Sequence, residues 1–145
     1  MDYEAARDSI QGHFNAYWVA NSAAVNGGKV PVVEWDNLEK LDPKPVGAAW
    51  ARCTVQHQLG VQRTLGETGT RRFGRAGLVT VQLFVPVAVG LTLADRLSKI
   101  AADAFEGKST VDGVWFRNTS VREVGPDASW LQTNIVSAFE YDQVK

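Results

Sequence analysis

The feature that most constrains this chain is an alternating apolar run followed directly by an amphipathic pattern, within residues 71–107. Between residues 77 and 87 every second position is apolar, which is typical of a β-strand with one buried face. These positions are Val79, Val81, Leu83, Val85 and Val87. Pro86 has no N–H group to give to a neighbouring strand, so it predicts the end of the strand or an edge position. A strand of this kind must pack against another apolar surface.

The second half of the same block predicts a helix that can supply that surface. Gly90 indicates a turn, and Thr92 followed three residues later by Asp95 is a capping-box pattern. Gly107 is expected to end the helix in a left-handed conformation. The apolar stripe comprises Leu93, Leu97, Ile100 and Ala104, widened by Ala94, Ala101 and Phe105. A ladder of alternating charge runs along the opposite side, formed by Asp95, Lys99 and Asp103.

Upstream of this block the sequence predicts another helix and a short strand. The apolar stripe of the first helix comprises Tyr3, Ala6, Ile10, Phe14, Tyr17 and Trp18. Residues 30–35 predict a strand, and Pro31 within it indicates an edge position. Residues 38–47 are rich in proline and charge, which indicates a loop. We expect the helix to dock on the sheet beside the second helix.

Three further segments have the patterns of strands. Residues 48–64 alternate well, with Ala49, Ala51, Cys53, Val55, His57 and Leu59 on one side, and a bend is expected at Gly60. Residues 111–117 and 130–141 predict the last two strands, joined by a turn at 124–127. Neither side of the final strand is wholly apolar, so the sheet is expected to be covered on one face and partly wetted or paired on the other.

These elements predict a single α+β domain over residues 1–145. Their order is α-β-β-β-α-β-β, and we expect a mixed, mostly antiparallel sheet with both helices packed on one face. A chain of 145 residues can bury about two-thirds of its unfolded surface, which is enough for one core. No internal repeat indicates a solenoid or an array.

The connection between the two central strands is the first place to look for a binding site. It spans residues 65–76, which is longer than the roughly two to five residues of a compact hairpin. It contains three glycines and is basic. The candidate binding residues in and beside it are Arg63, Arg71, Arg72, Phe73 and Arg75. The alternative interpretation is a solvated, flexible tip, since neighbouring arginines repel one another.

The sequence offers little for catalysis, and we expect no enzyme, no catalytic residue, no metal and no cofactor. His13, His57 and Cys53 are the only residues of their types, and none lies in a zinc-binding spacing. Cys53 and His57 are four residues apart on a strand, hence roughly 13 Å apart, too far for a nucleophile and its base. No phosphate-binding loop, GxSxG or HExxH motif is present.

Composition limits the partners and the compartment. The net charge of −1 and the pI of about 6.1 argue against a protein whose whole surface binds nucleic acid, so any basic site must be local. The single Cys53 cannot form an internal disulfide, which suits a reducing compartment. Asp2 and Glu4 do not suit a signal peptide, and no apolar run approaches the ~20 residues of a membrane span. We therefore expect a soluble protein that does not contact a membrane.

Several segments taken together resemble a family of small bacteriophage tail-terminator-like proteins. The segments are VPVVEWDN at residues 30–37, RRFGRAGLVTVQLFVPVAVG at 71–90, LADRLSKIAADAFEG at 93–107 and WLQTNIVSAFEYD at 130–142. The resemblance implies a ring, expected to be a hexamer, that caps the phage tail tube and offers a surface to the head–tail connector. Its implied partners are copies of itself, the tail tube protein, the connector and DNA passing through the lumen. Its implied location is the head–tail junction of the virion, with the host cytoplasm as the site of assembly.

Two alternatives stay open beside that resemblance. One is another neck or tail-completion adaptor of the same fold. The other is a nucleic-acid-binding module, in which Arg63, Arg71, Arg72 and Arg75 contact phosphates and Phe73 stacks on a base.

Overall fold

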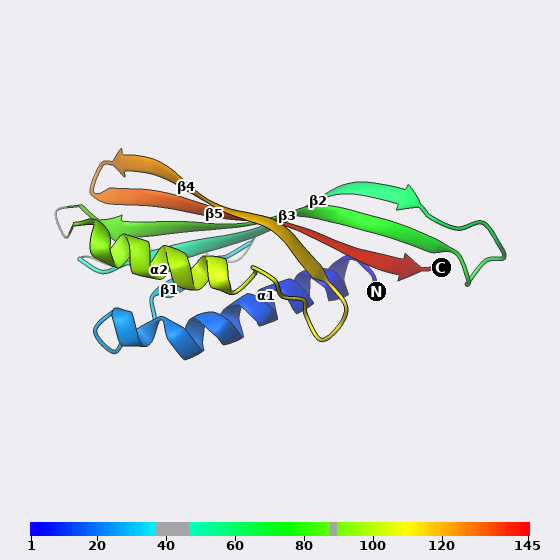
Figure 1. Cartoon of the computed structure of the whole chain (residues 1–145), viewed down its shortest axis with the longest axis horizontal. Coiled ribbons are helices and arrows are strands. Elements are labelled where there is room, and N and C mark those ends of the chain that lie inside the picture. Colours follow the sequence, from blue (N-terminus) through cyan, green and yellow to red (C-terminus); the bar gives the residue numbers. More distant parts are fainter. Residues whose placement is uncertain (37–46, 88–89) are drawn as a thin grey trace.

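The computed structural model of this chain describes residues 1–36, 47–87 and 90–145 (Figure 1). Two helices and five strands follow one another in the predicted order α-β-β-β-α-β-β, with a short 3-10 turn after the first helix. Their bounds are α1 Tyr3–Asn21, η1 Ala23–Val25, β1 Val32–Trp35, β2 Trp50–Gln62, β3 Arg72–Pro86, α2 Leu91–Asp103, β4 Trp115–Asp127 and β5 Trp130–Val144. The α+β class is therefore confirmed.

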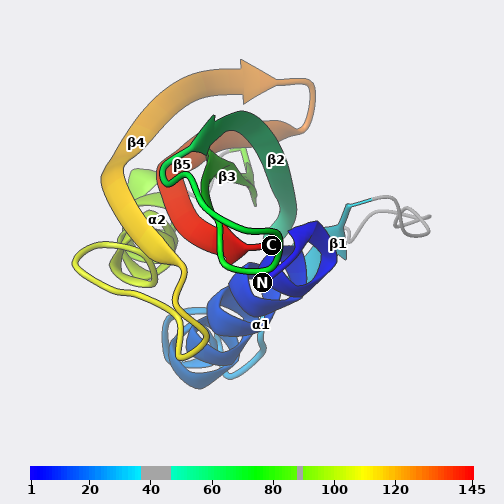
Figure 2. The same cartoon turned by 90° about the vertical axis from the view of Figure 1, so that its right-hand side faces the viewer.

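The strands form one sheet in the order β1-β2-β3-β5-β4. β1 pairs with β2 in parallel, and the other three pairings are antiparallel, so the sheet is mixed and mostly antiparallel as predicted. β3 and β5 lie at the centre and pair along almost their whole lengths, from Arg72 with Val144 to Pro86 with Trp130. Seen along its long axis, the sheet curls, with β4 and β2 on opposite sides of the central strands (Figure 2).

Both helices cover the same face of the sheet, and the core lies between them (Figure 1). The predicted apolar positions of β3 are wholly buried from Val79 to Val85, whereas Val87 is exposed. From α1 the core receives Ala6, Ile10, Phe14 and Trp18, and from α2 it receives Ala94, Leu97 and Ala101. Rings stack at the centre, where the Phe14 centroid lies 5.7 Å from that of Phe105. The two predicted stripes thus face the sheet for most of their lengths, although Tyr3 is exposed and Leu93 and Ile100 are only partly buried.

The first strand is shorter than predicted, because the ladder begins only after Pro31. β1 lies at the edge of the sheet, as expected from a residue without an N–H group. The carbonyl of Pro31 accepts a hydrogen bond of 3.1 Å from the Trp18 indole, and Asp36 Oδ2 accepts one of 2.7 Å from the Val55 N–H. The predicted loop at 38–47 lies outside the described residues, apart from Gly47.

The capping box predicted at Thr92 and Asp95 is wrong. α2 begins one residue earlier, at Leu91, so Thr92 lies inside the first turn and cannot cap it. The N-cap residue is Gly90, with φ 81°, a conformation that a residue with a Cβ adopts only with strain. At the other end the helix stops at Asp103 with Ala104 as its C-cap, so the prediction that Gly107 ends it is wrong, although Gly107 does have a left-handed φ of 66°. One step of the predicted charge ladder is confirmed by a 2.7 Å ion pair between Lys99 and Asp103.

The last two strands are longer than predicted, and the turn between them lies elsewhere. Residues 124–127 belong to β4, and the chain reverses at Ala128 and Ser129, where Ala128 has φ 53°. Pro126 is compatible with a strand here because β4 is an edge strand. β4 also begins later than expected, at Trp115. The turn was predicted too early in the sequence, because the glycine and proline that are typical of a turn are also tolerated in an edge strand.

The irregularity in β2 lies between His57 and Leu59, and Gly60 pairs regularly with Arg75. Because side chains alternate along a strand, one extra residue reverses the faces of everything that follows. Leu59 pairs with Ala76, on the face opposite the helices, and is 66% exposed. Leu59 was predicted on the same side as His57, and this assignment is therefore wrong. We call the face opposite the helices the open face.

The open face is covered by its own aromatic cluster at the end near β1. Trp50 and Phe84 stack with centroids 4.2 Å apart, and the Trp130 ring meets Trp50 edge-on at 6.1 Å. The Arg52 guanidinium lies over Trp50 at 5.5 Å and forms a 3.0 Å ion pair with the buried Glu34. The other end of the open face has no such cover and carries the candidate site.

Candidate functional site: the arm

The sheet extends beyond the helices as an arm, which we define as residues 59–76 together with residues 141–145. Figure 1 shows the arm at the right of the molecule, where the ends of β2, β3 and β5 run past the start of α1. The bulge at His57 and Leu59 marks its base. The arm holds five cationic side chains and two carboxylates, and every residue predicted as a binding residue lies in it.

The long flexible connection predicted at residues 65–76 is wrong in its extent. β3 begins at Arg72, so Arg72, Phe73 and Arg75 lie on a strand, and the connection spans only residues 63–71. Gln62 pairs with Phe73, and the N–H of Arg63 donates to the carbonyl of Arg72 over 2.8 Å. Residues 72–76 stay paired as a strand although the segment is basic and contains glycine, because β5 also pairs with β3 on its other side.

Two of the candidate arginines share one carboxylate. Arg63 Nε lies 3.0 Å from Asp142 Oδ1, and Arg72 Nη1 lies 3.7 Å from Asp142 Oδ2. All three side chains are between two-fifths and two-thirds exposed, so solvent screens the attraction and each pair stabilises the fold little. One carboxylate against two guanidinium groups leaves the arm with a local excess of positive charge.

Arg75 and Phe73 both contact other side chains of the same chain. The Arg75 guanidinium lies 5.3 Å from the Tyr3 ring and 5.4 Å from the Phe73 ring, and its Nε donates to Gln143 Oε1 over 3.1 Å. Lys145 Nζ also lies 5.4 Å from the Phe73 ring. Both side chains point to the face of the helices rather than to the open face. Phe73 is therefore flanked by cations of its own chain, which disfavours its stacking on a base.

Arg71 lies in the connection and has looser contacts. Its Nε donates to the carbonyl of Gly66 over 2.8 Å, and no carboxylate within the described ranges forms an ion pair with it. Beside it Leu65 is 90% exposed. The tip of the arm, which we define as residues 63–72, thus combines a bare aliphatic side chain with cations.

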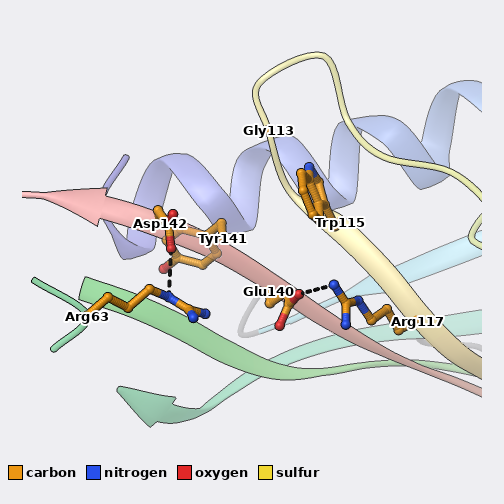
Figure 3. Close-up of a pocket in the computed structure, with 7 residues that line it drawn as sticks. All are labelled: Arg63, Gly113, Trp115, Arg117, Glu140, Tyr141 and Asp142. Carbon is orange, nitrogen blue, oxygen red and sulfur yellow. Dashed lines mark ion pairs between the residues drawn. The ribbon is translucent and has the colours of Figure 1, made fainter. Parts of the chain in front are cut away.

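A groove on the open face runs from the base of the arm towards β4 (Figure 3). Its volume is about 510 Å³, and its lining comprises Arg63, Gly113, Trp115, Arg117, Glu140, Tyr141 and Asp142. Arg117 Nη2 and Glu140 Oε1 form a 2.7 Å ion pair in it, and Trp115 is 55% exposed. Trp115 and Arg117 were missed as site residues because only the pairing of β4 with β5 brings them to the arm. An exposed tryptophan at the start of a strand was the one signal available.

Beneath the arm, on the face of the helices, lies a titratable pair. His57 Nε2 and the Tyr141 hydroxyl are 2.9 Å apart. Burial, aided by the Arg7 and Arg75 charges, lowers the pKa of His57 below its ordinary value of 6.5. Burial, with the neighbouring Tyr3, raises the pKa of Tyr141 to about 12, so its hydroxyl keeps its proton and can donate to a neutral His57. The pair joins the arm to the core.

Cys53 is the one cysteine of the sequence, and its side chain is buried. Burial, aided by the nearby Asp36 charge, raises the pKa of Cys53 far above its usual range, which leaves an unreactive thiol in the core. Among residues 1–36, 47–87 and 90–145 no three metal-ligating side chains gather at one place. In the same ranges no helix is both long and apolar enough to cross a membrane.

Comparison with known proteins adds one finding to this geometry. No protein-family model and no curated protein sequence match the chain. Some solved structures do have a similar fold. One of them, which is described only by a sequence identifier, is 15% identical to this chain and has a TM-score of 0.65 over 96% of both chains. Another is a chain of the virion of the native gene transfer agent particle, 17% identical, with a TM-score of 0.60 over 92% of both chains.

The fold is shared with a virion protein. At these identities the likeness concerns the fold alone, and it extends over nearly the whole chain. The predicted hexamer, its partners and the role of each arginine stay predictions.

Proposed function

We propose that this protein is a structural subunit of a phage-like virion. The observation that carries the proposal is the fold shared with a gene transfer agent virion chain over 92% of both chains. The resemblance of residues 30–37, 71–107 and 130–142 to tail-terminator-like proteins points the same way. Within the virion we assign the subunit to the end of the tail tube, as a ring that caps the tube and offers a joining surface to the head connector.

The arm supports an assembly role. It projects past the helices, and residues 59–65 expose Leu59, Val61 and Leu65, side chains that contribute nothing to the core of the monomer. Exposed aliphatic residues beside an excess of cations are typical of a surface that another protein covers. A nucleic-acid-binding role is less well supported, because Asp142 partly neutralises Arg63 and Arg72 while Arg75 and Phe73 are engaged within the chain.

The test is to inactivate the gene in the genome that encodes it and to examine the particles by electron microscopy. A cap covers the open end of the tube, so its loss should let tubes grow to irregular lengths and should leave heads without tails. Supplying the protein from a plasmid should restore tails of uniform length. Tails of uniform length that merely fail to join heads would favour the neck adaptor, and normal particles would contradict both roles.

A further inference from the structure

The tip of the arm has few contacts with the rest of the described chain, and its ion pairs to Asp142 are exposed. Leu65 is 90% exposed at its centre, and Arg71 contacts only a backbone carbonyl and the Thr68 hydroxyl. Arg72 shares Asp142 with Arg63 at a distance of 3.7 Å, which is a weak, screened pair. The tip is therefore an aliphatic knob set among cations that are only partly neutralised.

A surface of opposite character lies on the helix side of the molecule. It is a hollow of about 560 Å³ lined by Met1, Ala5, Asp8, Ser9 and Asp112, between the first turns of α1 and the loop before β4. The Ser9 hydroxyl donates to Thr110 Oγ1 over 2.8 Å, which fastens that loop to the helix. Neither Asp8 nor Asp112 is in an ion pair with any cation of the described ranges, and both are exposed.

The two surfaces match in chemistry. The hollow has carboxylates where the tip has guanidinium groups, and Val111 stands fully exposed beside Asp112, as Leu65 does beside the arginines. The hollow is large enough for a leucine side chain and part of a guanidinium group. Figure 1 shows the tip pointing away from α1 and from the loop that precedes β4, so a chain cannot fill its own hollow.

We propose that the tip of the arm of one copy docks in the acidic hollow of a second copy. Leu65 contacts Val111 and the apolar floor, while Arg71 and Arg72 meet Asp8 and Asp112. The contact joins two different surfaces of the chain, so repetition closes a ring or grows a filament. This inference rests on the proposed ring and names the residues of its subunit contact. Exposed charges act over about 8 Å at physiological salt, so the contact weakens as salt rises.

Charge reversal on each side tests the docking. One variant carries Arg71→Glu and Arg72→Glu, a second carries Asp8→Lys and Asp112→Lys, and a third carries all four changes. Self-association of the full chain is measured by native mass spectrometry and light scattering over a range of concentrations and salt. We expect each double variant to associate at least about tenfold more weakly, and the fourfold variant to regain much of the loss.

Two controls separate docking from folding and from net charge. Arg96→Glu with Arg122→Glu makes the same change in net charge as the Arg71 and Arg72 variant, on exposed positions outside both surfaces, and it should leave association unchanged. Leu65→Ser alters no charge and should weaken association without lowering the thermal midpoint. A double variant that fails to fold is replaced by Arg71→Glu or Asp112→Lys alone.

The outcomes distinguish this contact from the proposed function. A wild-type chain that stays monomeric throughout, reversals without effect, or no recovery in the fourfold variant would each overturn the docking. A ring that forms equally well in every variant would overturn the docking and leave the tail-cap proposal standing. An association that obeys the charge rules but stops at a dimer would support the docking and count against the ring.

Discussion

The arginines of the arm differ in role because their neighbours differ. Arg75 has a ring on two sides and a hydrogen bond to Gln143, whereas Arg71 contacts only the Gly66 carbonyl and the Thr68 hydroxyl of its own connection. The sequence shows the two only as members of one basic cluster, whereas the structure gives them different neighbours. Whether an arginine stabilises the fold depends on its burial and its partners, and not on its residue type.

We expect Arg75→Gln to lower the free energy of unfolding by about 0.5–2 kcal/mol, since it removes cation–π contacts and a hydrogen bond to Gln143. Arg71→Gln removes only an exposed contact and should leave stability nearly unchanged. Chemical denaturation of both variants measures the difference. Equal midpoints would show that the Tyr3 contact contributes nothing.

His57 predicts a pH dependence of stability. Burial lowers its pKa in the folded chain, so the unfolded chain binds a proton more readily. Stability should therefore fall as the pH drops below about 6.5 and should continue to fall through the lower folded pKa. His57→Gln should flatten this part of the profile of the urea midpoint against pH, with His13→Gln as the matched control. An unchanged slope in the His57 variant would assign the effect to other groups.

At the scale of the element, α2 shows how a helix is held by one face. Leu97 is wholly buried, whereas Lys99 two residues away points to solvent and pairs with Asp103. The capping box expected at its start is missing, and Gly90 offers no side chain to replace it. The helix must therefore depend on its packing against β3 and β5 more than on its own ends.

We expect Leu97→Ala to lower the free energy of unfolding by roughly 2–5 kcal/mol, because it leaves a cavity in the core. Lys99→Ala should hardly move the midpoint of chemical denaturation, since its ion pair is exposed. Measuring both variants in the same buffer gives the comparison. Similar midpoints would mean that the stripe assigned to the core is not buried.

At the scale of the whole molecule, a single core joins every element. Side chains from both helices and from all five strands belong to one cluster of buried residues or pack against it, including Val33 and Trp35 of β1. The arm differs from the rest because its strand ends lie beyond both helices, and Arg75 in it contacts the Tyr3 ring of α1.

We expect thermal unfolding of the monomer to be one cooperative transition, with coincident midpoints by far-ultraviolet circular dichroism and tryptophan fluorescence. Amides of residues 61–72 should nevertheless exchange with solvent well before those of residues 79–85, because the arm can open locally without disturbing the core. Native-state hydrogen exchange measures this difference. Equal protection in the two segments would show that the arm is part of the cooperative core.

Local periodicity was enough to predict most of the elements. The alternation over residues 77–87 and the stripe from Leu93 to Ala104 depend only on residues near in sequence. Val79, Val81, Leu83, Val85, Leu97 and Ala104 are buried as expected, Leu93 and Ile100 are partly buried, and Val87 is exposed. The class, the element order and the covered face followed from those patterns. The basic segment was also located, because its arginines are neighbours in the chain.

What surrounds those arginines was decided by the tertiary structure. Asp142 reaches Arg63 and Arg72 only because β5 pairs with β3, and Trp115 reaches the groove only through β4. The bulge that turns Leu59 to the open face leaves no local signal, since a bulge is set by how two strands meet. Periodicity shows which side of an element is apolar. Which strands pair with one another depends on the energy of the whole sheet. The sequence by itself therefore determined the core, and the tertiary structure decided the chemistry of the arm.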